Sequence, residues 1–477
     1  MYIGIDLGTS AIKCILIGDD GRVIATASEP LQVSRPKPGH SEQDPESWWL
    51  ATLAGFDKLT KQAPREMAAV RGIGLSGQQH GATLLDKAGN VLRPCILWND
   101  VRSAKECHEL VARLPDLPRI TGNPTLPGFT APKLVWVKKH EPEIFARVAK
   151  VLLPKAYLRY RLSGEFIEDM SDASGTAWLD VGKRAWSKAA LEATDLSLDH
   201  MPALAEGTEQ AGRLRAELAQ RWGMTQPPVI AGAIALGAIK PGDAFVSLGT
   251  SGVLWATTAG FAPNTTAAVH AFCHCVPNTW HQMGVILSAA SCLSWLSGVV
   301  GVAEGELLKE LGDMAERPTP VVFLPYLSGE RTPHNDADIR GAFAGLSHDT
   351  SRATLAQSVM EGVAFAMRDC LAALQAAGTQ LSSLDASGGG ARSRLWLSII
   401  ANVLNLPVNR LADSEVSGAM GGALLGRMAA TGEPATAVCK TPKRIETLEP
   451  RAGTRDAYAE SYARYRKLYP AIKEATR

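Results

Sequence analysis

The sequence predicts an α/β protein of two lobes, each built around a sheet, with a cleft between them. A Leu-Gly-Thr-Ser turn occurs twice, at Leu7–Ser10 and at Leu248–Ser251, and an apolar strand precedes and follows each copy. Each copy opens a half of the chain that continues into amphipathic helices. A repeated strand–turn–strand unit indicates an internal duplication. We therefore expect an N-terminal lobe of residues 1–242 and a C-terminal lobe of residues 243–477.

Length, charge and cysteine usage narrow the classes of protein that remain. A chain of 477 residues exceeds what one core normally organises. Its 49 lysines and arginines nearly balance 48 aspartates and glutamates, and a net charge of +1 argues against nucleic acid as a partner. Asp6 interrupts the first apolar run, which is unlike a secretory leader. The eight cysteines show no paired spacing. We expect a cytoplasmic protein with no membrane partner.

The hydrophobic pattern places the main elements within each lobe. Short apolar runs predict strands at residues 2–5, 12–17, 23–25, 244–247 and 253–255. Apolar residues at helical spacing predict helices at residues 46–59, 103–113, 353–376, 394–405 and 456–469, the last one stopping at Pro470. The uncharged stretch 284–303 carries regularly spaced serines from Ser288 to Ser297, which favours a helix buried inside the protein over a membrane span.

The turn after the first strand has the chemistry of a phosphate site. Asp6 lies near the end of the strand, and Gly8–Ser10 form the turn. Glycine lets the backbone approach a phosphate, amides and hydroxyls donate hydrogen bonds to it, and a carboxylate holds hydrated magnesium. A plain hairpin is the alternative for a single turn of this kind. The second copy, at Gly249–Ser251, favours two turns that hold the phosphates of a nucleotide from two lobes.

A third segment indicates where the nucleoside lies. Residues 385–393 read DASGGGARS and join a strand to the helix that begins at Arg394. Glycines at a helix N-terminus leave bare backbone on which a nucleotide can lie, although such a loop also serves as a tight turn. The chain has no GxxxxGK[ST] motif, so ATP binding requires a fold without a Walker loop. The nucleotide-binding candidates are Gly8, Thr9, Ser10, Gly249, Thr250, Ser251, Gly389, Gly390 and Ala391.

These segments together resemble the FGGY family of carbohydrate kinases, which implies a two-lobed actin-like ATPase (ribonuclease H-like) fold with duplicated domains. IGIDLGTS and SLGTSG match the family's two phosphate motifs, and SGGGARS matches its adenosine motif. Residues 128–140 fit the family's first signature, and residues 341–361 fit the second except at Thr354. The stretches SEQDPESWW, GQQHGATLLD, ILWND, MSDASGTAWLD and FLPYLSGERTPHN resemble the members that phosphorylate D-xylulose.

The resemblance implies roles for individual residues. Gln79 and His80 are expected to line the sugar pocket, and Asp100 and Arg102 match the family's W-x-D-x-R element beside the sugar. Without the family, His80 is more typical of a structural histidine than of a ligand. Asp6 is expected to act in catalysis by holding Mg²⁺. A pocket for a neutral polyol needs a cluster of amide, imidazole and carboxylate groups, and these residues supply one as a set.

One part of the family pattern is missing from the sequence. Members place their general base, an aspartate, in a loop resembling GGGDNAAG after a strand like Pro228–Gly232. Here Gly232 runs directly into Ala233–Gly237, the family's continuation beyond that loop. We expect that the aspartate lies in about seven residues between Gly232 and Ala233 that the printed sequence omits. The alternative is a real deletion in a non-catalytic relative.

The resemblance implies ATP-dependent phosphorylation of D-xylulose at its 5-hydroxyl, with ATP and Mg²⁺ as cosubstrate and metal. A kinase for another ketose or polyol is the alternative within the family. A sugar- or nucleotide-binding pseudokinase is the alternative if the deletion is real. An actin-like filament protein would explain the nucleotide motifs but not GQQHG or WNDVR. The family also makes a homodimer an open possibility.

Overall fold

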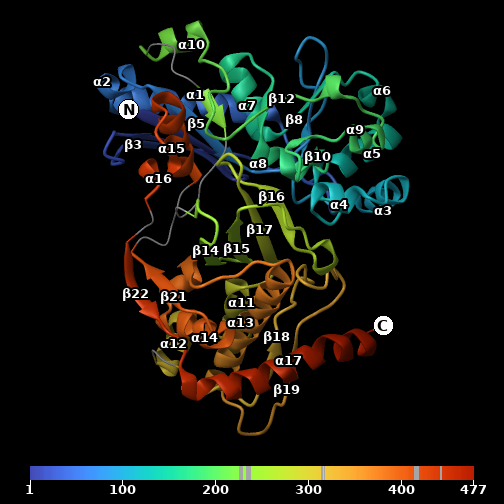
Figure 1. Cartoon of the computed structure of the whole chain (residues 1–477), viewed down its shortest axis with the longest axis vertical. Coiled ribbons are helices and arrows are strands. Elements are labelled where there is room, and N and C mark those ends of the chain that lie inside the picture. The colour runs from blue at the N-terminus through green and yellow to red at the C-terminus, as the bar shows by residue number, and fades with distance from the viewer. Residues whose placement is uncertain are drawn as a thin grey trace.

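Two lobes stacked one above the other form the molecule (Figure 1). The structure is a computed structural model that describes residues 1–224, 229–231, 238–312, 315, 317–412, 418–440 and 443–476. The N-terminal lobe lies at the top in Figure 1, and the C-terminal lobe lies below it with helix α17 across its base.

The N-terminal lobe is organised by a five-stranded sheet in the order β13-β5-β1-β2-β3. Its strands are β1 (Tyr2–Leu7), β2 (Ala11–Ile17), β3 (Val23–Pro30), β5 (Gly72–Gly77) and β13 (Val229–Ala231). β2 runs antiparallel to β1 and β3, whereas β5 runs parallel to β1 and β13. The carboxyl ends of β1, β5 and β13 therefore meet at one edge of the sheet.

The C-terminal lobe repeats this topology. Its sheet has the order β16-β17-β15-β14-β20-β21-β22, and the five strands from β17 to β21 pair in the same directions as β3 to β13. They are β16 (His270–Cys273), β17 (Trp280–Ile286), β15 (Gly252–Thr258), β14 (Ala244–Leu248), β20 (Leu384–Ser387), β21 (Val408–Leu411) and β22 (Arg444–Leu448). The repeat confirms the predicted duplication and the predicted actin-like fold.

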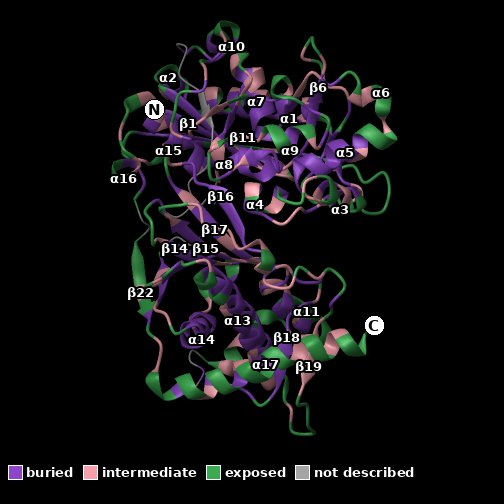
Figure 2. Cartoon of the chain, turned by 45° about the vertical axis from the view of Figure 1, so that its right-hand side comes forward, coloured by how far each residue is buried: buried purple, intermediate pink, exposed green. Residues whose placement is uncertain are grey.

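The long helices form where the hydrophobic pattern predicts them. α1 (Pro45–Gln62) is capped by Asp44, whose side chain accepts a hydrogen bond from the Glu46 amide, and the helix buries Trp48 and Phe56. α3 (Ala104–Arg113), α13 (Arg352–Ala376) and α14 (Arg394–Leu404) match the other predicted helices within a residue or two. Figure 2 shows that α13 and α14 are mostly buried in the core of the C-terminal lobe.

Two predictions about helices are wrong. The stretch 284–303 contains the end of β17 and then the short helix α11 (Ala290–Val300), which is half exposed because only Cys292, Leu293 and Leu296 are buried on it. Its Ser291 and Ser297 hydroxyls donate to backbone carbonyls instead of packing against another helix. Among the described residues, no helix is long and apolar enough to span a bilayer.

The C-terminal helix α17 (Arg455–Ala475) also continues through Pro470. Its last turns are held by Asp336, which pairs with Lys473 at 2.6 Å and accepts a hydrogen bond from the Tyr469 hydroxyl at 2.9 Å. These contacts stabilise a helix that the missing proline N–H would otherwise weaken. The predicted tyrosine face is present, with Tyr458 and Tyr465 buried.

Helix α15 (Gly418–Thr431) belongs to the second half of the sequence but packs on the sheet of the first (Figure 1). Gly418, Gly422 and Gly426 form one face of this helix, four residues apart. A Cβ on Gly418 would come within 2.8 Å of the Asp6 carboxyl carbon, and a Cβ on Gly422 would come equally close to the Gly74 carbonyl oxygen. The missing side chains therefore allow the helix to contact β1 and β5 directly.

The remaining elements complete the two lobes. In the N-terminal lobe they are β4 (Glu42–Gln43), α2 (Pro64–Ala68), β6 (Thr83–Leu85), β7 (Cys95–Ile96), α4 (Leu117–Thr121), α5 (Thr130–His140), α6 (Pro142–Phe145), β8 (Lys150–Leu152), α7 (Pro154–Ser163), β9 (Ile167–Asp169), α8 (Met170–Ala173), β10 (Leu179–Asp180), β11 (Ala185–Trp186), α9 (Lys188–Glu192), β12 (Ala203–Ala205) and α10 (Ala216–Arg221). In the C-terminal half they are α12 (Glu304–Leu311), β18 (Val322–Leu324), β19 (Ala342–Ala344) and α16 (Ala435–Val438).

Candidate active site

The first phosphate turn lies at the sheet edge where β1 and β5 end. Asp6 is opposite Ser76 of β5 and Lys13 of β2 in the strand register. Burial raises the pKa of the Asp6 carboxyl, and Lys13 and the Ser76 hydroxyl partly offset that effect. The turn closes with a hydrogen bond of 3.0 Å from the Gly8 amide to the Ala11 carbonyl. The Asp6 carboxylate thus lies at the end of β1, next to a tight glycine turn.

The predicted residue Thr9 is held from three sides. Its hydroxyl accepts a hydrogen bond from the Trp98 indole at 3.1 Å and donates to Gln78 at 3.3 Å. Its carbonyl accepts from the Gln43 side chain at 2.8 Å. The adjacent Ser10 side chain is exposed. The Thr9 hydroxyl therefore fixes the turn against the segments on either side of it, and sequence reasoning gave no sign of the Trp98 contact.

Gln79 and His80 follow β5 at the same sheet edge as Asp6. His80 adopts a left-handed backbone conformation, with φ of +66°, which is rare for a residue with a side chain. Its Nδ1 lies 2.8 Å from the Gly175 carbonyl oxygen. Because a carbonyl only accepts, Nδ1 carries the proton and Nε2 presents a lone pair. Burial and the neighbouring Lys133 lower the pKa of His80 to about 3, so the ring is neutral at pH 7.

Asp100 and Arg102 bind each other. The Arg102 guanidinium donates to both oxygens of the Asp100 carboxylate, at 2.9 and 2.7 Å, and Asp100 also accepts from the Ser41 amide at 2.6 Å. Arg102 makes a second ion pair with Glu42 at 2.7 Å and lies over the Trp136 ring. In this structure the pair holds the loop after Trp98 in place, and its contact with sugar stays a prediction.

The second phosphate turn is fixed by helix α11. The Ala290 and Ala289 amides donate to the carbonyls of Gly249 and Thr250, at 2.8 and 2.9 Å, and the Ser291 hydroxyl donates to Thr250 at 2.7 Å. Both Thr250 and Ser251 are exposed. The turn is therefore anchored through its carbonyls, which leaves its exposed side chains available to a ligand.

The predicted adenosine loop lies beside this second turn. β14 and β20 are parallel neighbours, so Gly249–Ser251 and Gly388–Ala391 emerge at the same sheet edge. Gly388 has φ of +84°, and a Cβ there would come within 2.7 Å of the Leu248 carbonyl oxygen. By contrast, a Cβ on Gly389 would meet nothing within 4 Å. The loop thus packs closely on one side and exposes bare backbone on the other, while Gly390 and Ala391 are buried.

The expected general base falls outside the described residues. The strand that precedes it, β13, is parallel to β5 and pairs Ala231 with Leu75. The chain therefore leaves β13 at the edge where Asp6 and His80 lie. Asp243, the nearest carboxylate along the sequence, accepts hydrogen bonds from the Ile239 and Lys240 amides, so it belongs to a turn as the sequence indicates.

A buried acidic cluster lies next to Gln79, which hydrogen-bonds to Asp172. Glu168, Asp169 and Asp172 bring carboxylate oxygens within 4.8 Å of one another. The ammonium of Lys155 lies 2.6 Å from Asp169 and 3.3 Å from Asp172. Burial raises the pKa of Glu168 to about 8, which removes one negative charge at pH 7. Lysine therefore already supplies the positive charge that a metal ion would bring.

The structure adds a group of residues that the sequence did not single out for a role in the site. Asn123, Phe129, His270, Phe272 and Arg331 lie close to His80. The rings of His80 and Phe129 are 4.7 Å apart, and those of Phe129 and His270 are 5.9 Å apart. These residues come from distant segments of both lobes. Only Phe129 and Arg331 lie in the family-like stretches, and the sequence gave no signal for the other three.

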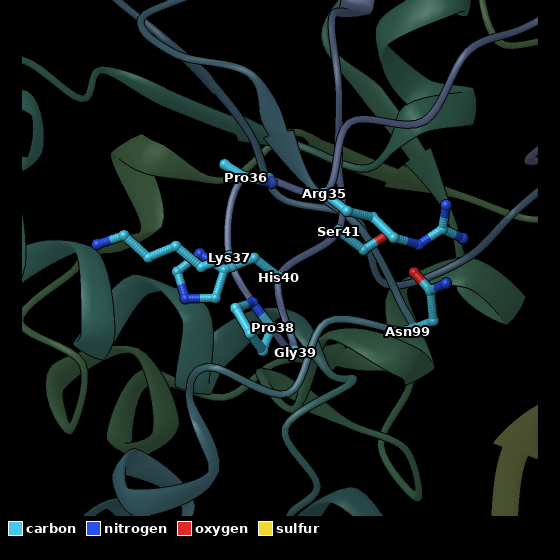
Figure 3. A pocket seen from close by; sticks show the side chains of 8 residues that line it. All are labelled: Arg35, Pro36, Lys37, Pro38, Gly39, His40, Ser41 and Asn99. Carbon is cyan, nitrogen blue, oxygen red and sulfur yellow. The ribbon is translucent and has the colours of Figure 1, made fainter.

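A hollow of about 460 Å³ is lined by residues 35–41 and by Asn99, which precedes Asp100 in the sequence. Arg35, Lys37, His40 and Asn99 are among its lining residues. Figure 3 shows the Arg35 and Lys37 side chains extended to opposite sides of it. Both are exposed, and they do not converge on one point, so they do not form a charged ligand site there.

Comparison with known proteins agrees with this geometry. The N-terminal domain of the FGGY family of carbohydrate kinases matches residues 1–235, and its C-terminal domain matches residues 244–430. The chain belongs to the FGGY family of carbohydrate kinases. A xylulose kinase from Escherichia coli (strain K12) is 47% identical over 481 residues, covering 99% of this chain and 99% of that protein. That alignment is longer than this chain, so it contains gaps in this chain.

Two solved structures are also similar to this chain. A structure described as a xyloylose kinase from Brucella ovis is 53% identical, with a TM-score of 0.97 and coverage of 99% of both chains. A xylulose kinase from Rhodospirillum rubrum is 29% identical, with a TM-score of 0.92 and the same coverage. These matches confirm the predicted family and fold.

Proposed function

We propose that this FGGY kinase transfers the γ-phosphoryl group of ATP to the 5-hydroxyl of D-xylulose. The observation that carries the proposal is that each lobe has a Leu-Gly-Thr-Ser turn at the carboxyl edge of its sheet, and that Gln79 and His80 lie at the same edge as the first turn. The similar proteins from Escherichia coli, Brucella ovis and Rhodospirillum rubrum, described as xylulose or xyloylose kinases, support the choice of sugar.

Asp6 is the residue that we propose holds Mg²⁺. Its donor set fits this metal, because a partly buried carboxylate lies next to the Ser76 hydroxyl and beneath a glycine turn. Magnesium would neutralise charge on the phosphates. The turns Gly8–Ser10 and Gly249–Ser251 hold the phosphates, and Gly389–Ala391 hold the nucleoside.

The sugar pocket positions the hydroxyl that is phosphorylated. Neutral His80 offers its Nε2 lone pair to a sugar hydroxyl, and Gln79 offers an amide. The loop after Trp98, held by Asp100 and Arg102, closes the pocket beside them. Positioning of this kind can lower a barrier by about 7–11 kcal/mol. We place the general base after β13, between Gly232 and Ala233, as the family pattern implies.

The direct test is a coupled assay of ADP release with ATP, Mg²⁺ and D-xylulose. We expect turnover with D-xylulose and at least about tenfold lower kcat/KM with D-ribulose or xylitol, which place hydroxyls differently. A higher kcat/KM with another ketose or polyol would mean that this other sugar is the substrate. Sugar and ATP binding without any ADP release would instead favour a binding protein that lacks the base.

A peptide map across residues 232–233 accompanies this assay. A peptide with an aspartate-containing insertion there would supply the base, whereas a peptide running directly from Gly232 to Ala233 would support the binding protein. The possible homodimer and the cytoplasmic location stay predictions, which size-exclusion chromatography with light scattering and cell fractionation can test.

A further inference from the structure

Arg331 lies on a loop whose backbone is fixed on both sides. The Thr332 amide donates to the Val285 carbonyl at 3.0 Å, and the Thr332 hydroxyl donates to the Ala268 carbonyl at 2.9 Å. On the other side, the Glu330 carboxyl accepts from the Leu287 amide at 3.1 Å. Both neighbours are almost fully buried. Arg331 is therefore presented by a rigid segment along β17.

The Arg331 guanidinium has no carboxylate within ion-pair distance among the described residues. Its neighbour Glu330 does not neutralise it, because burial raises the pKa of that carboxyl to about 8. Burial also lowers the pKa of Arg331 itself, although arginine stays charged. A shielded cation without a counter-ion is costly, and an anionic ligand removes the cost.

The groups around Arg331 are neutral acceptors. The Asn123 side-chain amide donates to the carbonyls of Thr121 and Ala271, at 2.6 and 3.1 Å, so its oxygen faces His270. The His270 Nδ1 lies 2.9 Å from that oxygen and must donate to it. His270 Nε2 then turns a lone pair toward Arg331 across a long 3.5 Å contact. Burial holds the pKa of His270 well below its usual value, so this ring neither repels nor neutralises the guanidinium.

Arg331 and its loop are linked to both halves of the candidate active site. On one side it is near enough to His80 to lower the pKa of that imidazole. On the other side its loop is bonded to Leu287, two residues before Ala289, whose amide holds the carbonyl of Thr250 in the second phosphate turn. β16 and β17, which carry these contacts, lie on the side of the C-terminal lobe that faces the N-terminal lobe (Figure 1).

We propose that Arg331 binds the phosphoryl group as it passes from ATP to the sugar, and then the phosphate of the product. This inference rests on the proposed function. The sugar hydroxyl oxygen forms a bond to the γ-phosphorus as the bond from that phosphorus to the bridging β–γ oxygen breaks, and ADP leaves. The hydroxyl proton goes to the general base. Arg331 donates hydrogen bonds to the non-bridging oxygens and exchanges no proton.

The test compares binding of D-xylulose and D-xylulose 5-phosphate by calorimetry, without need of turnover. For Arg331→Gln we expect product affinity about 10- to 100-fold weaker than in the wild type and sugar affinity within about threefold of it. Arg340→Gln is the matched control, because Arg340 lies nearby in sequence and bonds only the Ala337 and Ile339 carbonyls among its described contacts. It should bind both ligands like the wild type.

Three outcomes would overturn the inference. Unchanged product binding in Arg331→Gln excludes a phosphate contact. An equal loss for both ligands assigns Arg331 to the sugar or to the structure of the pocket. An equal loss of product binding in Arg340→Gln makes the effect one of general charge. Should Arg331→Gln fail to fold, Arg331→Lys carries the test, with an expected selective loss of product binding of about threefold or more. An inactive wild type that also fails to bind xylulose would reject the proposed function instead.

Discussion

The two Leu-Gly-Thr-Ser turns share sequence and topology but differ in what surrounds them. In the N-terminal lobe, Asp6 precedes the turn and lies next to Ser76 and Gly418. In the C-terminal lobe, Ser247 occupies the corresponding position, and the turn is anchored to α11 and covered by the glycine-rich loop. One duplicated unit has thus given a turn suited to a metal and a turn suited to a nucleotide.

The largest expected difference between the two turns comes from removing the Asp6 carboxylate. Asp6→Asn keeps the shape but loses the charge that would hold Mg²⁺, so we expect kcat to fall by at least about 100-fold. The matched variant Ser247→Ala should change kcat by less than about threefold, because Ser247 holds no metal in this account. Steady-state kinetics measures both. The affinity for the sugar should stay unchanged in Asp6→Asn. An equal fall in kcat in Asp6→Asn and Ser247→Ala would contradict separate roles for the two turns.

Substitutions of two neighbouring glycines in the adenosine loop, Gly388 and Gly389, should affect protein stability and ATP binding separately. Gly388→Ala places a Cβ against Leu248 at a positive φ, and we expect it to destabilise the protein by about 1–3 kcal/mol. Gly389→Ala meets open space, so its stability should stay within about 0.5 kcal/mol of the wild type.

The KM for ATP should nevertheless rise several-fold in Gly389→Ala, because the methyl group occupies the surface where the nucleoside is proposed to lie. Urea unfolding and ATP titrations measure the two effects. An unchanged KM for ATP in Gly389→Ala would remove this loop from the nucleotide site.

The smallest expected effect is the contribution of His80, in the proposed sugar pocket, to the pH dependence of protein stability. The pKa of His80 is about 3 in the folded protein, against an ordinary value near 6.5 when unfolded. Below pH 6.5 the unfolded chain gains a proton that the folded protein does not, so stability falls with pH, by up to about 1.4 kcal/mol per unit. His80→Gln lacks this contribution.

Urea unfolding at about pH 7 and about pH 5 should therefore show a smaller loss of stability in His80→Gln than in the wild type. Other buried histidines, such as His270 and His274, contribute to both proteins and cancel in the comparison. Equal losses in the two proteins would mean that His80 titrates normally.

Much of the fold was predictable because it depends on local patterns. The repeated turn, its flanking strands and the helices near residues 46–59 and 353–376 follow from apolar periodicity and glycine placement. Pro470 misled the prediction because a tertiary contact, Lys473 with Asp336, outweighs the local preference of proline. The serines of 284–303 misled it because small polar residues suit an exposed helix as well as a buried one.

The site was predictable only in part because its contacts are long-range. Family motifs pointed to Asp6, the two turns and His80, whose roles stay predictions. No local signal could place α15 on the first sheet or join Trp98 to Thr9. The cluster of Asn123, His270 and Arg331 forms only when the two lobes meet.

The measurement that tests the central claim most directly is ³¹P NMR of the product made from ATP and D-xylulose labelled with ¹³C at C5. The account predicts one new phosphate monoester signal, coupled to the labelled carbon and to its two protons. An ester signal without coupling to that carbon would place the phosphate on another hydroxyl. No ester at all from a protein that binds both ATP and the sugar would contradict phosphoryl transfer.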